Sequence, residues 1–508
     1  MIDTATELGV KLTEIDDLRN AAGVLGWDQQ TMMPPRGGSA RADALGTLER
    51  ITHDRFTDPE IGRLLDAEAA RLQGSDPDSD AVRNVSVTRR RYEKACRVPT
   101  ELAEELARAG SIGQEAWVAA RAASDFKAFA PYLEHNIELV RRYVDCFDGF
   151  ACAYDVLLDD YDPGASTEQV ARVFAELKAE LVPLIAAVSG RELDVSAVHG
   201  DFPVERQREL VRRAVSRMGF SREGWRIDDA VHPFATSFGS GDVRITTRWD
   251  EEYFPAALFG AMHECGHGLY EAGIADKLQR MPIGHADSLS VHESQSRLWE
   301  NMVGRGLPFA NVLTPWVGEL FGTPVEPEAL FRAVNRIAPS LIRVEADEAT
   351  YGLHIILRFE LEQELIEGRL AIADLPEAWN ARMHEYLGID VPDDAHGVLQ
   401  DVHWSAGMVG YFPTYSLGNL IAGQLWERLH VDIPDVEDQI AAGELSTLRE
   451  WLREHIHRHG SKFSSAELLD RVVGKPIEVG PFVAYLKAKL SKVYGGISDS
   501  SGLDLASA

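Results

Sequence analysis

The chain has 508 residues, of which 45% are hydrophobic and 26% are charged, and this composition is ordinary for a globular protein. Its formal net charge of −30 at pH 7 would repel phosphate backbones, which argues against a nucleic-acid partner. There is no apolar run of about 18 or more residues, no secretory-signal pattern, and the four cysteines are scattered. We therefore expect a cytoplasmic protein with no membrane partner.

Helical periodicity covers most of the chain. Apolar residues recur at helical spacing between charged ones over residues 100–126 and 126–150. A helix-start signature at Ser166 introduces the same pattern over residues 166–188. Residues 464–474 and 479–496 continue this pattern toward the C-terminus. The sequence therefore predicts a mainly α fold.

Breaks between the predicted helices are short. Residues 74–80 form a polar turn signal, and no long linker or fixed-period repeat follows it. We therefore predict a single large helical body over residues 1–495. The small, polar residues 496–508 are predicted to form a flexible C-terminal tail.

Residues 234–254 depart from the helical pattern. After a glycine-rich turn come the β-favouring residues Val243, Ile245, Thr246, Thr247 and Trp249. They predict one or two strands of a small sheet. A helix follows directly, with Asp250 as the expected N-cap, Pro255 near its first turn and Gly273 just past its end.

That helix carries the motif His-Glu-x-x-His. His263 and His267 are four residues apart and therefore lie on one helical face, where two neutral imidazoles suit zinc. Glu264 lies on the adjoining face and can act as general base toward an attacking water. The alternative is a pair of core histidines that are satisfied by hydrogen bonds.

The surroundings of the motif favour a functional site. The helix is apolar almost all round, and burying two histidines and a carboxylate costs several kcal/mol unless they have partners. Gly266 and Gly268 each cost about 1 kcal/mol in a helix interior, so we expect another backbone or a substrate to approach there. Cys265 is expected only to pack in the core.

A catalytic zinc needs a third protein ligand. Glu271 lies two turns, roughly 12 Å, from His263 and cannot share the ion. The downstream candidates are His285, Asp287, His292 and Glu293. Patterning alone leaves the choice open, because Glu293 could also form a capping box with Ser290 or an ion pair with Arg297.

Six separated motifs resemble the M32 family of metallocarboxypeptidases, the thermostable carboxypeptidase Taq type, from about residue 10 to about residue 495. They are HPF at residues 232–234, DVRIT at 242–246, HECGH at 263–267, HESQ at 292–295, IRVEAD at 342–347 and GVLQDVHW at 397–404. The resemblance implies that His263, His267 and Glu293 bind the metal and that Glu264 is the general base.

The resemblance also implies the fold and the activity. It implies a gluzincin-type helical body with a deep cleft and a small sheet beside the zinc site, with residues 1–495 as the catalytic domain. Members are usually homodimers and remove single residues from the C-termini of peptides with broad preference, whereas C-terminal proline is resisted. Zinc is the expected metal, and cobalt supports activity in some members.

Exopeptidase action requires a group that binds the free carboxylate, and the planar fork of arginine does this best. Arg343 is our first candidate and Arg244 our second, because both lie in the matching motifs, and Arg248 is a weaker alternative. The competing interpretation is a structural ion pair with Glu345, Asp347 or Asp242.

Attack on the scissile carbonyl creates an oxyanion that needs a neutral hydrogen-bond donor. Residues 400–419 are similar to the His-then-Tyr segment of related helical zinc peptidases, which points to Tyr415 as the donor. His403 is a further catalytic candidate, and Tyr411, the weaker candidate donor, is expected to bind substrate. Aromatic residues at this spacing also occur in cores. His232 is expected in the substrate cleft or in a loop-bracing hydrogen bond.

We therefore predict a zinc carboxypeptidase that acts on short peptides with a free C-terminus. An endo-oligopeptidase or dipeptidyl carboxypeptidase on the same scaffold is the alternative with the same chemistry. A non-catalytic, metal-binding helical protein is the alternative of another class.

Overall fold

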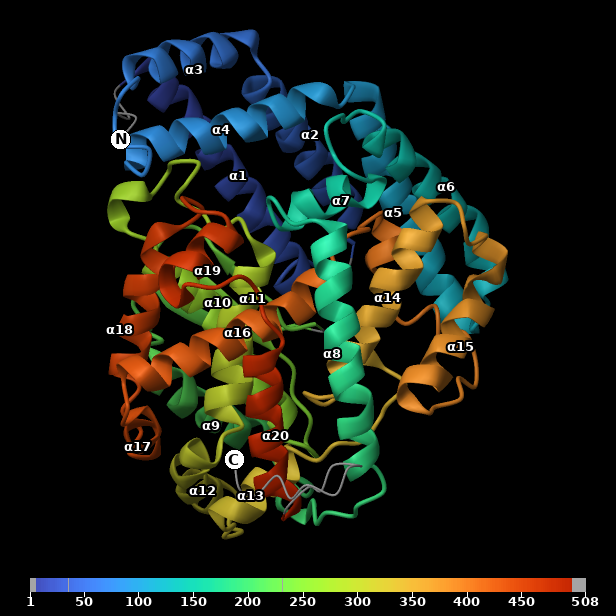
Figure 1. The fold of residues 1–508 in the computed structure, drawn as a ribbon, viewed down its shortest axis with the longest axis vertical. Helices are drawn as coiled ribbons and strands as arrows, with labels where there is room; N and C mark the ends of the chain where they lie inside the picture. The colour runs from blue at the N-terminus through green and yellow to red at the C-terminus, as the bar shows by residue number, and fades with distance from the viewer. Residues whose placement is uncertain (1–5, 35, 231, 496–508) are drawn as a thin grey trace.

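The computed structural model describes residues 6–34, 36–230 and 232–495, which are mainly α-helical (Figure 1). The predicted tail over residues 496–508 lies outside them. The helices before the sheet are α1 (Glu7–Thr31), α2 (Gly38–Phe56), α3 (Pro59–Arg71), α4 (Asp80–Arg97), α5 (Thr100–Ala123), α6 (Phe126–Val144), α7 (Ala153–Tyr161), α8 (Thr167–Val188) and α9 (Val204–Met218).

The helices after the sheet carry the chain to its C-terminal end. They are α10 (Pro255–Gly273), α11 (Leu289–Arg297), α12 (Leu307–Phe321), α13 (Pro327–Val334), α14 (Tyr351–Ile366), α15 (Leu375–Leu387), α16 (Pro413–Asp432), α17 (Val436–Ala441), α18 (Ser446–His455), α19 (Ser465–Val473) and α20 (Gly480–Tyr494). None of the described helices is long and apolar enough to cross a bilayer.

The predicted helices are confirmed. The three in the first half of the chain are α5, α6 and α8, and the two near the C-terminus are α19 and α20. Ser166 caps α8 by accepting a hydrogen bond from the amide of Gln169. Ser464 and Glu467 form a reciprocal capping box at the start of α19.

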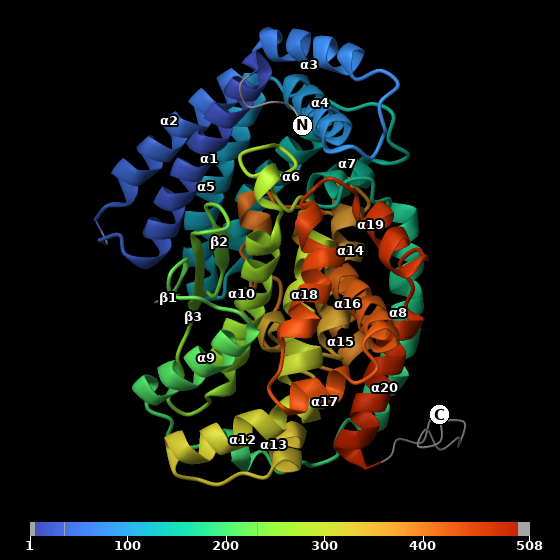
Figure 2. The same cartoon turned by 90° about the vertical axis from the view of Figure 1, so that its left-hand side faces the viewer.

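The first four helices gather at one end of the molecule (Figures 1 and 2). They enclose an apolar core of their own, built from Leu8, Leu12, Ile15, Phe56, Ile61, Leu65 and Val85. A much larger apolar core joins the helices from α5 to α20. Within it α14 and α20 pack beside α8, α16 packs against α14 and α20, and α11 lies between α10 and α16. The assignment of residues 1–495 to one catalytic domain stays a prediction.

A small sheet lies beside α10 (Figure 2). It consists of β1 (Trp225–Asp229), β2 (Ala235–Ser237) and β3 (Val243–Thr247) in the order β1-β3-β2. β3 pairs parallel to β1, with Ile245 opposite Ile227, and antiparallel to β2. The prediction of a mainly α fold with a small sheet is confirmed. However, the sheet has three strands, and the predicted segment supplies only β2 and β3.

The start of α10 differs from the prediction. Phe254 occupies the N-cap position and makes no side-chain capping bond. The expected cap, Asp250, instead accepts a hydrogen bond from the amide of Glu252 in the turn before the helix. Pro255 is the first helical residue, as expected, because proline has no amide hydrogen to leave unpaired there. Gly273 is the last helical residue and does not lie past the end of the helix.

Candidate metal centre

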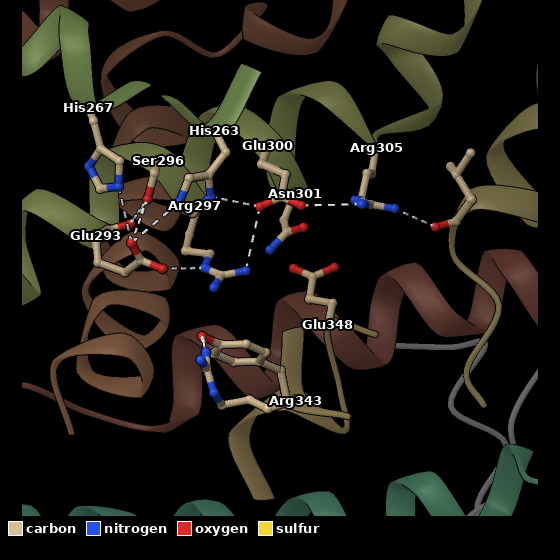
Figure 3. A network of polar contacts seen from close by, with 12 residues as sticks. His263, His267, Glu293, Ser296, Arg297, Glu300, Asn301, Arg305, Arg343 and Glu348 are labelled. Carbon is tan, nitrogen blue, oxygen red and sulfur yellow. Dashed lines mark hydrogen bonds and ion pairs between the residues drawn. The ribbon is translucent and has the colours of Figure 1, made fainter. Parts of the chain in front are cut away.

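Three side chains from α10 and α11 converge on one point (Figure 3). One potential ligand atom from each of His263, His267 and Glu293 lies within 4.8 Å of the other two. The Nε2 atoms of His263 and His267 lie 3.6 and 3.3 Å from the same oxygen, Oε2 of Glu293. Two imidazole nitrogens and one carboxylate oxygen are a donor set that suits zinc and leaves a further position free. Within the described ranges this is the one group of three or more such side chains.

Close helix packing brings these side chains together. A Cβ added at Gly266 would lie 2.8 Å from the backbone of Gln295 and Ser296, so α10 and α11 meet at the glycine. A Cβ at Gly268 would lie 2.6 Å from the ring of Trp225 in β1. The expected approach of another backbone is therefore confirmed at Gly266, whereas Gly268 is approached by side chains of the sheet and not by a backbone.

The N-terminal end of α11 is anchored by a buried carboxylate. Ser288 is the N-cap and accepts from the amide of Val291, whereas the capping box considered for Ser290 and Glu293 is not formed. Asp162, which follows α7, accepts hydrogen bonds from the hydroxyls of both serines. Burial raises the pKa of Asp162, although these hydroxyls oppose the shift. These hydrogen bonds tie the start of α11, just before Glu293, to the residue that follows α7.

The two carboxylate oxygens of Glu293 have different partners. Oε1 accepts from Nε of Arg297 at 2.6 Å, while Oε2 faces the histidines. Burial alone would raise the pKa of Glu293, but the charge of Arg297 and the nearby imidazoles hold it well below its ordinary value. The ion pair and the metal-ligand interpretation, which were alternatives in the sequence, are thus compatible in the structure.

Burial also changes the protonation of the neighbouring groups. It lowers the pKa of His267 to about 3, together with the charge of His292, so His267 is neutral at pH 7, as a metal ligand must be. Burial raises the pKa of Glu264 to about 7. The carboxylate of Glu264 forms no hydrogen bond or ion pair with the rest of the described chain, which leaves it available for chemistry. Cys265 is fully buried in the core, as expected.

The groups that contact the outer nitrogens of the two histidines were not predicted in that role, although Glu271 and His292 were weighed as ligands. Nδ1 of His263 lies 2.9 Å from Oε2 of Glu300. Nδ1 of His267 contacts Nδ1 of His292, whose Nε2 lies 3.0 Å from Oε1 of Glu271. The spacing of Glu271 from His267, one helical turn, was a usable signal, whereas nothing in the sequence pattern singles out Glu300.

The candidate substrate-binding residues form a second cluster. The ring of Tyr415 lies 5.3 Å from that of Tyr411, which lies 5.3 Å from the ring of His403. The guanidinium carbon of Arg343 lies 5.1 Å from the ring of Tyr415. Burial raises the pKa of Tyr415 well above its ordinary value, and the charge of Glu293 acts in the same direction. The structure thus groups four of the predicted residues near the metal ligands.

Arg343 has protein partners on three of its nitrogens. Nε and Nη2 donate to Oδ1 of Asp401 at 3.0 and 2.8 Å, and Nη1 donates to the hydroxyl of Tyr351 at 2.9 Å. The ion-pair partners considered from the sequence, Glu345 and Asp347, are therefore wrong. Arginine has five N–H groups, so one remains on each terminal nitrogen of Arg343.

The other candidates lie in different surroundings. Arg244 donates to both oxygens of Asp242, at 2.9 and 2.8 Å, and stacks 4.3 Å from the ring of Trp27, as the structural alternative predicted. Arg248 is exposed and has no hydrogen-bond or ion-pair partner in the described ranges. His232 is also exposed, and partial burial together with the charges of Arg248, Arg121 and Arg343 lowers its pKa.

Comparison with known proteins agrees with this geometry. Residues 7–490 match the family described as carboxypeptidase Taq (M32) metallopeptidase. The chain is 42% identical over 491 residues to thermostable carboxypeptidase 1 of Thermus thermophilus, covering 94% of this chain and 96% of that protein. It is 36% identical to carboxypeptidase 1 of Bacillus subtilis, covering 95% of this chain and 97% of that protein.

Solved structures show the same relationship. The crystal structure of the M32 carboxypeptidase from Deinococcus radiodurans matches with a TM-score of 0.92 and 39% identity, covering 96% of this chain and 99% of that one. A structure titled as a putative oligoendopeptidase F matches with a TM-score of 0.54 at 14% identity, which shows likeness of fold alone. The chain therefore belongs to the carboxypeptidase Taq (M32) family of metallopeptidases and is a metallocarboxypeptidase.

Proposed function

We propose that the chain is a zinc-dependent enzyme that releases single amino acids from the free C-termini of short peptides, with broad preference and with C-terminal proline disfavoured. The observation that carries this proposal is the meeting of His263, His267 and Glu293 beside the unpartnered carboxylate of Glu264. The family match and the names of the relatives support the exopeptidase reaction. The broad preference and the discrimination against proline rest on the family resemblance.

The residues present fit zinc. His263, His267 and Glu293 would hold it, and cobalt is the expected substitute. When bound, the ion supplies Lewis acidity, which polarises the scissile carbonyl and lowers the pKa of a water molecule toward about 7. Both imidazoles have a polar partner on Nδ1, which leaves each Nε2 to face Glu293.

The protein groups around this site would move the protons. We assign Glu264 as the general base that takes a proton from the attacking water and hands it to the leaving amine. Tyr415 would donate a hydrogen bond to the carbonyl oxygen as negative charge develops there. Its raised pKa supports this role, because the phenol stays protonated. His403, whose ring packs against Tyr415, is the further catalytic candidate beside it, and Tyr411 would bind the substrate.

Arg343 is the proposed anchor for the substrate carboxylate. Its side chain lies against Tyr415, and it keeps one free N–H on each terminal nitrogen. Arg244, despite its ion pair with Asp242, and His232 stay substrate-binding candidates from their motifs alone, and Arg248 is the alternative that has no partner in the described ranges. We also propose, from the family resemblance, that the protein is a homodimer, which size-exclusion chromatography with light scattering tests.

One experiment tests reaction and metal together. The purified protein is analysed for bound metals and is then incubated with a peptide while mass spectrometry follows the products. A carboxypeptidase gives a ragged ladder from the C-terminus, halted by a chelator and restored by zinc. Glu264→Gln should keep the zinc and lose turnover, and unchanged turnover would defeat the enzyme assignment for this site.

A C-terminally amidated peptide separates the exopeptidase from an endo-oligopeptidase or a dipeptidyl carboxypeptidase. The shared fold of a putative oligoendopeptidase F makes this comparison necessary. An exopeptidase that binds the free carboxylate should lose most of its kcat/KM on the amide. An endo-oligopeptidase would cleave both peptides alike, and a dipeptidyl enzyme would release pairs of residues.

A further inference from the structure

The two candidate ligand histidines have different partners on Nδ1, the outer nitrogen that faces away from Glu293. The outer nitrogen of His263, Nδ1, lies 2.9 Å from a carboxylate oxygen of Glu300 (Figure 3). The outer nitrogen of His267 contacts another imidazole, that of His292. His292 in turn contacts the carboxylate of Glu271, so this carboxylate reaches His267 only through His292. Of the two candidate ligand histidines, only His263 therefore has its outer nitrogen hydrogen-bonded to a carboxylate within the described part of the chain.

The position of Glu300 is fixed by the residues around it. Glu300 belongs to a π-helical segment, η3 (Leu298–Gly304), that continues α11 beyond Arg297. Such segments are rare and frequently occur at functional sites. Oε1 of Glu300 lies 3.2 Å from Nη2 of Arg305, and Oε2 lies 3.5 Å from Nη1 of Arg297. The carboxylate is thus held between two guanidinium groups, with its side chain only 13% exposed.

Arg297 also links Glu300 to the metal-site carboxylate. Its Nε donates to Oε1 of Glu293 at 2.6 Å, while its Nη1 faces Glu300, and its guanidinium stacks 4.4 Å from the ring of Tyr351. One arginine therefore lies between the two carboxylates that face the His263 ring, pairing closely with Glu293 and more loosely with Glu300. Each ring nitrogen of His263 thus faces a different carboxylate, Glu293 at Nε2 and Glu300 at Nδ1.

We propose that Glu300 is a positioning residue that orients His263 for metal binding. Its carboxylate accepts the Nδ1–H of His263, so the lone pair is on Nε2 and faces His267 and Glu293. A carboxylate partner raises the basicity of a ligating imidazole and fixes its tautomer, and loss of such a partner typically weakens metal binding by about 10- to 100-fold. This inference rests on the proposed function only in assigning His263 as a ligand.

The test measures the zinc affinity of the purified apoenzyme by competition with a chromophoric chelator. Glu300→Gln, which keeps the size of the side chain but removes its charge, should raise the zinc Kd by about 10- to 100-fold. Glu271→Gln should raise it less, because His292 stands between Glu271 and the ligand. The visible spectrum of the cobalt-substituted Glu300→Gln protein should also differ from that of the wild type, since the ligand field senses the orientation of His263.

Glu348→Gln is the matched control. Glu348 is buried near the same network (Figure 3) and pairs with Lys489 at 2.7 Å, but it does not contact any of the three candidate ligands. Its loss removes one buried charge without touching His263, so the zinc Kd should stay that of the wild type. An equal rise of the zinc Kd in Glu300→Gln and Glu348→Gln would overturn the inference, because general destabilisation of the protein would then explain both.

A second variant keeps the test decisive if Glu300→Gln does not fold. Glu300→Asp retains the charge between the two arginines but shortens the side chain by one methylene, which draws the carboxylate away from Nδ1. It should fold and still bind zinc more weakly than the wild type. Wild-type affinity in both variants at position 300 would overturn the positioning role and leave the proposed function intact. A wild type that binds zinc but releases no amino acids would overturn the proposed function while the affinity ratio still supports Glu300.

Discussion

Gly418 of α16 lies directly against the side chain of Glu293. A Cβ at Gly418 would come within 2.7 Å of both Cβ and Cγ of Glu293 and within 3.2 Å of its backbone carbonyl carbon. Real Cβ atoms essentially never make contacts under 3.0 Å, and the atoms on the other side belong to a buried helix, which cannot give way as a flexible chain end would. The metal-site carboxylate is therefore confined between α10 on one side and a glycine of α16 on the other.

Gly418→Ala should displace Glu293 from the two histidines. Overpacking of this kind costs about 1–3 kcal/mol, which outweighs the gain of about 1 kcal/mol in helix propensity from glycine to alanine. We expect a lower free energy of unfolding for the metal-free protein and a higher zinc Kd. Chemical denaturation of the apoenzyme and chelator competition measure the two quantities separately.

Gly46→Ala is the control for that variant. Gly46 also lies inside a helix, α2, but a Cβ there would meet nothing within 4 Å. The same substitution should therefore stabilise the protein by up to about 1 kcal/mol and leave the zinc Kd unchanged. If both alanine variants were stabilised and bound zinc normally, the close approach at Gly418 would not confine Glu293.

Glu362, which is not a candidate metal ligand, should make the free energy of unfolding depend on pH. Burial raises its pKa to about 7, although it accepts hydrogen bonds from Tyr154, Trp404 and the amide of Gly410. The folded protein thus binds a proton that the unfolded chain releases near pH 4.5. The resulting stability is fully present below about pH 4.5 and is lost as the pH rises through about 7, by up to about 3 kcal/mol.

Glu362→Gln should remove this pH dependence. The variant cannot ionise, so its free energy of unfolding should fall less than that of the wild type between pH 5 and pH 8. It should also be less stable at low pH, because an amide cannot accept hydrogen bonds from donors at both of its ends. Urea denaturation of both metal-free proteins across this range provides the measurement, and parallel profiles would contradict the raised pKa.

Local spacing explains which parts of the site were predictable. The facing of His263 and His267 follows from helix geometry alone, and the helix itself follows from its apolar pattern and Pro255. Glu293 comes from another helix, so patterning left it among several candidates and the family resemblance was needed to choose it. The three-stranded sheet was only partly predicted, since β1 has five residues and two of them are aspartates.

The contacts that the sequence did not predict depend on residues far apart in the chain. Asp401, the partner of Arg343, is 58 residues away in the sequence. Only acidic residues close to Arg343 in the sequence were considered as its partners, and these were Glu345 and Asp347. Glu300 reaches His263 through a π-helical segment, whose spacing differs from the 3.6-residue period that the prediction used. Helix periodicity is a local property, whereas these contacts are set by tertiary packing.

Tyr415→Phe tests the proposed hydrogen bond to the carbonyl oxygen. Removal of a donor that acts on the developing charge typically lowers kcat by about 100- to 1,000-fold, with a smaller effect on KM. We expect a loss in this range, with zinc content unchanged, because Tyr415 does not belong to the candidate ligand set. Tyr411→Phe should have a smaller effect. A larger loss of kcat in Tyr411→Phe would transfer the donor role to Tyr411.

Arg343→Lys tests recognition of the substrate carboxylate. The wild type should prefer a free C-terminus over an amidated one, and the variant should lose most of that preference in kcat/KM, because lysine cannot form the bidentate contact. Arg358→Lys is the matched control, since Arg358 is also buried and also pairs with Asp401. Both variants should be less stable, as each disturbs a buried ion pair. If the two variants kept the wild-type preference equally, Arg343 would be a structural partner of Asp401, and the unpaired Arg248 would become the candidate anchor.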